Sequence, residues 1–270
     1  CFDGTGYGTD GAIWGGEWLI ANYAGFERGA HLRYVPLPGG DAAVKRPYRL
    51  ALAHLWAAGI DWEPTIPAAA ACPPGEMRIL RRQFETGFQT VPTSSMGRLF
   101  DAIAALIGLR QQISYEAQAA IELENAVDAA HADAYAFALE SAGDGQIAVD
   151  AAPVMRAVVE DVRAGLSAGM IAAHFHHAVA DATAQVCARL RAATGIETVA
   201  LSGGVFQNVT LAEAASARLT ALGFRVLMHH IVPANDGGLA LGQAVIGAWG
   251  VGEGSHVLRD SRTDRADLRR

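Results

Sequence analysis

Two glycine-pair segments near the carboxyl end constrain this chain more than any other feature. The first, Leu201-Ser202-Gly203-Gly204-Val205-Phe206-Gln207-Asn208, joins a β-branched strand pattern to a helical pattern. The second, Asn235–Gln243, joins a loop to another helical pattern. At a glycine pair the backbone can approach a ligand closely, and free N–H groups at a helix N-terminus bind phosphate. Two such segments in one domain predict a nucleotide held between loops.

The pattern along the chain predicts an α/β fold with a large helical insertion. After residue 197 strands and helices alternate, with strands at 197–202 and 224–228 and helices at 206–222 and 238–248. Residues 1–20 predict a strand, a glycine turn and a second strand, and residues 21–47 predict loops with a turn at 36–40. The alanine-rich middle predicts helices, which we place at 48–58, 75–86, 97–108, 114–140 and 153–191.

Composition excludes several classes of protein. The 270 residues are 51% hydrophobic and 18% charged, which suits one large domain or two small lobes. A net charge of −7 argues against nucleic acid as a main partner. No apolar run approaches the length of a membrane span, and no signal peptide opens the chain. Cys1, Cys72 and Cys187 form no Cys-x-x-Cys pair and predict reduced thiols, so we expect a cytoplasmic protein.

The two ends of the chain suggest its domain boundaries. Because Cys1 lies inside a strand pattern, we expect the chain to be a fragment of a longer protein. Residues 1–250 are predicted to form one domain that is incomplete at its N-terminus. Residues 251–270 alternate arginine with aspartate, which predicts a solvated, poorly ordered tail.

Two aspartates are candidate metal ligands. Asp3 lies at a strand end before a glycine-rich turn, and Asp236 lies on a loop before a helix. Carboxylates in such positions suit a cation that also contacts phosphate. An ordinary hairpin at Asp3 and a helix cap at Asp236 are the alternatives.

Other candidate residues are nucleotide ligands. Gly203 and Gly204 permit close approach of a base or phosphate, and the amide of Asn208 suits an adenine edge. Asp101, one turn into a helix capped by Ser94 or Ser95, and Glu116 suit ribose hydroxyls. Simple strand-to-helix turns and solvated acids remain the alternative interpretation of these residues.

The histidines form a third candidate cluster. His174, His177 and Asp181 share one face of a predicted helix and are spaced like metal ligands. Because apolar residues surround them, core packing is the favoured interpretation. His229 and His230 lie at a strand end, where a surface role is favoured over support of the site.

Several longer motifs resemble one family, the C-terminal domain of the hydrogenase-maturation carbamoyltransferases called HypF. The resemblance spans residues 1–250 in the family's order, through Phe2–Gly11, Trp14–Glu17, Pro38–Ala43, Thr93–Asp101, Tyr115–Ala120, Ser202–Asn208 and Asn235–Gln243. It implies an actin/sugar-kinase/Hsp70-like (ribonuclease H-like) lobe related to the TsaD/Kae enzymes.

The resemblance also implies an activity. Members use ATP and carbamoyl phosphate to make carbamoyl-adenylate in an upstream domain, and then pass the carbamoyl group to the C-terminal cysteine of HypE. Carried over by motif, Asp3 and Asp236 are catalytic residues and ligands of a divalent metal, Zn or Fe. Gly203, Gly204 and Asn208 face the adenine nucleotide, and Asp101 and Glu116 lie near the ribose.

One family motif has no counterpart in this sequence. The family carries a His-x-x-x-His metal motif ahead of the strand that opens this chain, so we expect weak metal binding and little catalysis from the chain alone. Two other classes stay open, a small-molecule kinase or ATPase of the same superfamily and a non-catalytic nucleotide-binding module.

Overall fold

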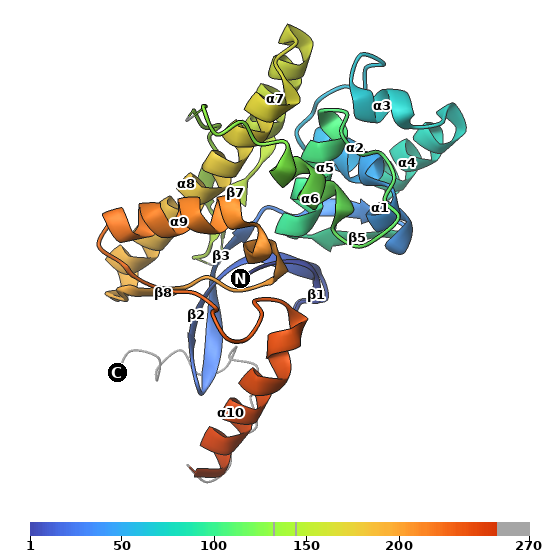
Figure 1. The fold of residues 1–270 in the computed structure, drawn as a ribbon. Helices are drawn as coiled ribbons and strands as arrows, with labels where there is room; N and C mark the ends of the chain where they lie inside the picture. Colours follow the sequence, from blue (N-terminus) through green and yellow to red (C-terminus); the bar gives the residue numbers. More distant parts are fainter. Residues whose placement is uncertain (132, 144, 253–270) are drawn as a thin grey trace.

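The computed structural model describes residues 1–131, 133–143 and 145–252. Most of the predicted tail, from residue 253 on, lies outside the described residues. Within them the chain forms a seven-stranded mixed sheet, a separate two-stranded sheet and helices around both (Figure 1).

The large sheet has the strand order β4-β5-β2-β3-β7-β6, and β1 pairs antiparallel with β2. Its strands are β1 (Phe2–Tyr7), β2 (Ile13–Asn22), β3 (Gly25–Leu32), β4 (Val35–Pro38), β5 (Thr90–Thr93), β6 (Ala138–Ser141) and β7 (Ile147–Asp150). The small sheet pairs β8 (Thr198–Ala200) in parallel with β9 (Arg225–Leu227).

The helices lie in two groups. α1 (Asp41–Lys45), α2 (Pro47–Ala57), α3 (Pro67–Ala71), α4 (Pro74–Thr86), α5 (Met96–Leu106) and α6 (Gln118–Asn125) form the first. In it α5 packs on α2, α6 and β1. The second contains α8 (Ala168–Thr194) and α9 (Val209–Ala221), which pack along each other. α7 (Ala152–Ala164) contacts α2 and α5 of the first group as well as α8. α10 (Leu239–Gly252) extends away from both groups (Figure 1).

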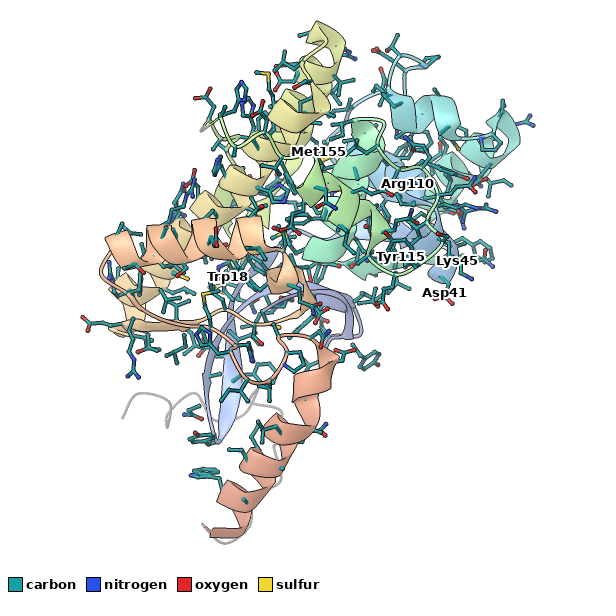
Figure 2. The ribbon with its side chains drawn as sticks, in the orientation of Figure 1. Trp18, Asp41, Lys45, Arg110, Tyr115 and Met155 are labelled. Atoms are coloured by element: carbon teal, nitrogen blue, oxygen red, sulfur yellow. The ribbon has the colours of Figure 1, made fainter. Side chains whose placement is uncertain are left out.

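Aromatic rings join β1 to the segment that follows β8. Phe2 is 1% exposed and stacks on Phe206 with ring centroids 5.0 Å apart, and it meets Trp18 edge to face at 4.9 Å. Figure 2 shows Trp18 in the interior, below α8 and α9. Because aromatic burial contributes strongly to core stability, these contacts hold β1 against the first glycine pair.

A buried ionic network joins β2 to β3 and to Ser94, just ahead of α5. Arg28 on β3 donates from Nε to Glu17 Oε2 at 2.5 Å, and its guanidinium lies 4.1 Å from the ring centroid of Trp14. Glu17 Oε1 also accepts from the backbone of Gly15 and from the hydroxyl of Ser94. A buried carboxylate with this many donors is satisfied, so the network is compatible with the core.

Two predictions about local structure were wrong. Residues 21–47 are not loop-rich, since β3, β4 and α1 lie there. Only Gln118–Asn125 is helical within the predicted helix 114–140. Two strands, β6 and β7, lie in the region of the predicted helix 114–140 and its connection to the helix predicted at 153–191.

Candidate functional site

The first candidate site is a cavity of about 650 Å³ between β1, the start of α5, the start of α6 and the two glycine-pair segments. Its volume lies within the range of about 300–1,000 Å³ typical of small-molecule sites. The predicted site residues that border it are Asp3, Glu116, Gly204, Asn208 and Asp236. Segments far apart in the sequence therefore meet at one cavity.

Asp3 and Asp236 approach the cavity from different elements. Asp3, on β1, accepts a hydrogen bond from the Gly4 N–H at 2.7 Å through Oδ1. Its Oδ2 has no hydrogen-bond partner among the described residues. Asn235 supplies the cap of the following turn by accepting from the Gly237 N–H. Because Asn235 does the capping, the exposed Asp236 carboxylate is not occupied by that role.

The two glycines of the first pair have different roles. Gly203 has a φ of +98°, and a Cβ there would lie 2.2 Å from the Phe2 carbonyl oxygen, so the fold itself requires glycine. Gly203 does not border the cavity. Gly204 has an ordinary φ, and a Cβ there would lie 3.1 Å from Asp3 Oδ1 and 3.8 Å from Asn235 Cβ. Gly204 thus keeps open the space between Asp3 and the second glycine-pair segment.

Asn208 is held in place by its own hydrogen bonds. Its Oδ1 caps α9 by accepting from the Leu211 N–H at 2.8 Å, and its Nδ2 lies 2.8 Å from His176 Nε2. His176 is fully buried on α8, and its Nδ1 lies 2.7 Å from the Ala172 carbonyl oxygen. Burial lowers the pKa of His176 to about 4, so the neutral ring donates from Nδ1 and accepts at Nε2. One Asn208 amide hydrogen is therefore committed to His176.

The first turn of α9 is less open to phosphate than the sequence predicts. Leu211 N–H donates to Asn208, and Thr210 N–H donates to Glu124 Oε1 at 3.1 Å. Glu124 also borders the cavity. Because side chains of this chain satisfy both N–H groups, they do not form a ready anion site.

Asp101 does not border the cavity. Its side chain is fully buried, and Oδ2 lies 3.0 Å from Arg98 Nη2. Burial raises the pKa of the Asp101 carboxyl to about 6, against the opposing effects of Arg98 and the Ala120 N–H. Helix α5 turns Asp101 into the core, so the structure does not bring it to a ribose in this cavity.

Arg98 is a cavity residue that the sequence did not single out. It is 6% exposed, borders the cavity, and has a buried Nε without a hydrogen-bond partner among the described residues. An arginine this buried needs a counter-charge, which Asp101 supplies from behind. Its place three residues before Asp101 on a predicted helix was the signal available in the sequence.

Glu116 lies at the exposed rim of the cavity, next to a strained residue. Ala117, which follows it and precedes α6, has a φ of +60°, in the left-handed region that non-glycine residues rarely adopt. Backbone strain of this kind persists where the surrounding structure holds it in place, often at binding sites. The left-handed Ala117 thus forms the backbone turn between Glu116 and α6.

The helical histidines have other partners. His177 contacts Arg218, which also pairs with Asp181, whereas His174 lies against Tyr135 and 3.8 Å from Asp161. These contacts agree with the favoured packing interpretation. Across the described part of the chain, no three His, Cys, Asp or Glu side chains gather closely enough to hold a metal. Asp3 and Asp236 alone are too few for a closed zinc site, but they suit a cation that shares its other positions with phosphate and water.

Known proteins similar to this chain share its fold. The family described as "Carbamoyltransferase, Kae1-like Domain, second subdomain" matches residues 1–243. Carbamoyltransferase HypF of Rhodobacter capsulatus is 41% identical over 249 residues, which cover 91% of this chain and 31% of that protein. Carbamoyltransferase HypF of Rhizobium leguminosarum bv. viciae is 39% identical over 245 residues, which cover 89% of this chain and 30% of that protein. The crystal structure of full-length HypF in the phosphate- and nucleotide-bound form matches with a TM-score of 0.88 at 40% identity, over 94% of this chain and 33% of that one.

Fold and cavity together define a Kae1-like α/β lobe, which confirms the predicted fold class. The chain belongs to the HypF carbamoyltransferase family. It spans about a third of the length of these curated relatives. Over the described residues, no helix is long and apolar enough to cross a membrane.

Proposed function

We propose that this chain transfers a carbamoyl group from carbamoyl-adenylate to the C-terminal cysteine thiol of a HypE-like maturation protein. That transfer serves cyanide-ligand synthesis for [NiFe]-hydrogenase. ATP and carbamoyl phosphate supply the adenylate, through regions outside this chain. The observation that carries the proposal is the single cavity bordered by Asp3, Gly204, Asn208 and Asp236, in a member of a carbamoyltransferase family.

The cavity suits an adenylate in its size and in the distribution of its polar groups. Gly204 and Gly237 leave room for the phosphate beside Asp3, and Arg98 adds a buried cation to the lining near Gly4. The uncommitted hydrogen of the Asn208 amide and the Glu116 carboxylate suit the base and the ribose. A nucleotide in this cavity agrees with the similar full-length HypF crystal structure, which is of a phosphate- and nucleotide-bound form.

Asp3 and Asp236 are the residues that would hold a divalent cation at the phosphate. A bound cation would supply Lewis acidity, which stabilises negative charge on phosphoryl and carbamoyl oxygens. Zinc or iron, the predicted metals, need more ligands than these two carboxylates provide.

The nucleophile comes from the partner and not from this chain. None of the three cysteines, all of which lie in the described part, borders the cavity. Burial raises the pKa of both Cys72 and Cys187 to about 11, so neither is a thiolate at neutral pH. In the proposed reaction the partner's thiol loses its proton to solvent, and its sulfur bonds to the carbamoyl carbon. The bond from that carbon to the AMP oxygen breaks, and AMP leaves with the electron pair.

A chimera tests the proposed activity. The segment of Rhodobacter capsulatus HypF that matches this chain is replaced by residues 1–250, and the chimera is incubated with ATP, carbamoyl phosphate and a HypE-like protein. Mass spectrometry then follows carbamoylation of the C-terminal cysteine. We expect carbamoylation, and we expect Asp236→Asn to reduce the initial rate at least ~100-fold if its carboxylate holds the cation at the reacting phosphate.

The matched control is Asp133→Asn, an acidic residue of the described chain that does not border the cavity. It removes the same charge and should leave the rate unchanged. A folded chimera that binds its partner but transfers no carbamoyl group would contradict the proposal. So would equal rates in wild type and Asp236→Asn.

A further inference from the structure

Arg98 is a buried cation beside the candidate site whose hydrogen-bonding capacity is only partly used. The residue is 6% exposed, and it forms an ion pair through Nη2, which lies 3.0 Å from Asp101 Oδ2. A guanidinium carries N–H donors on all three of its nitrogens, and the buried Nε of Arg98 has no hydrogen-bond partner among the described residues. Because buried polar groups are normally paired, an unpaired donor at the wall of a cavity indicates a ligand.

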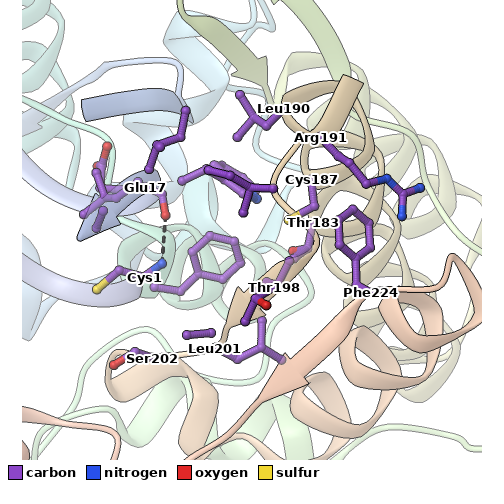
Figure 3. Close-up of a pocket in the computed structure, with 18 of the residues that line it drawn as sticks. Cys1, Glu17, Thr183, Cys187, Leu190, Arg191, Thr198, Leu201, Ser202 and Phe224 are labelled. Carbon is purple, nitrogen blue, oxygen red and sulfur yellow. Dashed lines mark hydrogen bonds between the residues drawn. The ribbon is translucent and has the colours of Figure 1, made fainter. Parts of the chain in front are cut away.

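Arg191 shows how another arginine beside a cavity is satisfied by this chain itself. It borders a second cavity, of about 430 Å³, next to Phe224 (Figure 3). Its Nη1 donates to the Leu222 carbonyl at 2.9 Å, and its guanidinium lies 4.1 Å from the ring centroid of Phe224. Within the described part of the chain, Arg98 has no such carbonyl or ring partner. The two arginines therefore differ in what they have left to bind.

The backbone around Arg98 brings it to the same end of the candidate site as Asp3. A Cβ on Gly4 would lie 3.7 Å from Arg98 Nη2. A Cβ on Gly97 would lie 3.1 Å from the Asp3 carbonyl oxygen, so α5 approaches β1 closely at this point. All four of these residues line the cavity. A ligand group that lies beside Asp3 in the cavity is therefore also near Arg98.

Arg98 lies in the first turn of α5, where a positive charge is unfavourable. Ser95 caps this helix by accepting from the Arg98 N–H at 3.1 Å. The N-terminus of a helix carries a partial positive charge, which favours acidic side chains there and disfavours arginine. The first turn of α5 contains no acidic residue. An anion bound at Arg98 would be stabilised by the guanidinium and by the helix end together.

The other charged residues of the cavity lining are acidic. Among the described residues that line it, Arg98 is the one basic residue, and the acids are Asp3, Glu116, Glu124 and Asp236. An anionic group in the cavity is repelled by these carboxylates and attracted by Arg98. A nucleotide that enters the cavity is therefore oriented with its phosphate toward Arg98.

We propose that Arg98 is the anion-binding residue of this cavity, which binds the 5′-phosphate of an adenosine nucleotide, and that Asp101 positions its guanidinium from the core side. Arginine suits this task because its planar fork matches the oxygens of a phosphate. Asp101 does not line the cavity, so it acts through Arg98. The choice of an adenosine nucleotide rests on the proposed function, whereas the anion site rests on Arg98 and its surroundings.

Calorimetric titrations of AMP and of adenosine into this chain test the assignment. Both are made in EDTA, so that no divalent cation at Asp3 or Asp236 contributes to the affinity. We expect Arg98→Gln to lower the ratio of AMP affinity to adenosine affinity at least ~10-fold, because hydrogen bonds to charged groups are strong. The affinity for adenosine itself should stay unchanged. Arg98→Lys keeps the charge but loses the fork, so it should keep part of the ratio.

Further variants separate ligand binding from folding. Arg98→Gln combined with Asp101→Asn leaves no buried charge unpaired and should show the same loss of the ratio. Asp101→Asn alone keeps the cation but removes its support, so the ratio should fall in part while adenosine binds as before. The matched control is Arg110→Gln, because Arg110 (Figure 2) pairs with Glu122 and does not line the cavity. This control should leave the ratio unchanged.

An unchanged ratio in both Arg98→Gln and the double variant would overturn the proposal. So would equal losses of AMP and adenosine binding, which would indicate a purely structural role, or a folded wild type that binds neither compound. An unchanged ratio in Asp101→Asn would overturn its positioning role. A ratio that falls as expected, while the chimera described above transfers no carbamoyl group, would support the anion site and contradict the proposed function alone.

Discussion

The contact between Asn208 and His176 predicts a measurable coupling between the candidate site and the core. Asn208→Ala removes the cap of α9, worth typically about 1 kcal/mol, with a range of about 0.5–2 kcal/mol. It also leaves the fully buried His176 Nε2 without its donor, which costs about 1–3 kcal/mol. We therefore expect Asn208→Ala to lower the free energy of unfolding by about 2–4 kcal/mol.

Two further variants separate these contributions. Asn208→Ser keeps a capping oxygen but is too short to reach His176, so it should cost only about 1–3 kcal/mol. In a His176→Phe background no buried ring nitrogen is left unpaired, and the cost of Asn208→Ser should fall below about 0.5 kcal/mol. Urea unfolding followed by circular dichroism gives the free energies of unfolding of the wild type, Asn208→Ser, His176→Phe and the double variant. Equal costs of Asn208→Ser in both backgrounds would refute the reasoning.

The remaining predictions concern pH, the buried ion network and the first glycine pair. Burial lowers the pKa of His54 and of His176 to about 4, below the unfolded value, so stability is full above pH 6.5 and is lost as pH falls toward 4. Each histidine contributes up to about 3 kcal/mol to this pH dependence. Urea unfolding should show a free energy of unfolding that falls between pH 7 and pH 4.5, and His54→Leu should make that fall smaller. Arg28→Met leaves the buried Glu17 carboxylate without its counter-ion, so the free energy of unfolding should fall by about 3–5 kcal/mol, and a change below 1 kcal/mol would contradict this. Gly203→Ala should destabilise by about 3 kcal/mol and Gly204→Ala by less than about 1 kcal/mol in thermal unfolding, and the reverse order would contradict the roles assigned to the pair.

The carboxyl-terminal part of the fold was the easiest to predict. Strands and helices alternate there, and β8, α9, β9 and α10 each begin within three residues of their predicted starts. Ser95 caps α5, as one of the two predicted serines. Glycine pairs mark turns by their backbone freedom, so the local sequence indicated the two segments that carry Gly204, Asn208 and Asp236 to the cavity.

The rest depended on contacts between distant segments. β3 carries Glu27 and Arg28 and lacks an alternation of apolar residues. The strand can bury Arg28 because Glu17, on the neighbouring strand β2, neutralises its charge. Hydrophobic periodicity cannot reveal a strand whose buried residue is charged. The family resemblance implied a place near the ribose for Asp101, but a motif does not state which face of α5 meets the core, where Asp101 lies. The pairing of Asn208 with His176 joins α9 to α8, and neither residue alone indicates it.

Calorimetric titration of ATP into this chain tests the central claim most directly. The claim is that the cavity between the two glycine-pair segments binds an adenine nucleotide. We expect binding in the wild type, strengthened by a divalent cation, and loss of that strengthening in Asp236→Asn. Gly204→Val fills the space beside Asp3 with no backbone strain, so it should abolish binding in a protein that still unfolds cooperatively. ATP binding with equal affinity to wild type and Gly204→Val would contradict the account.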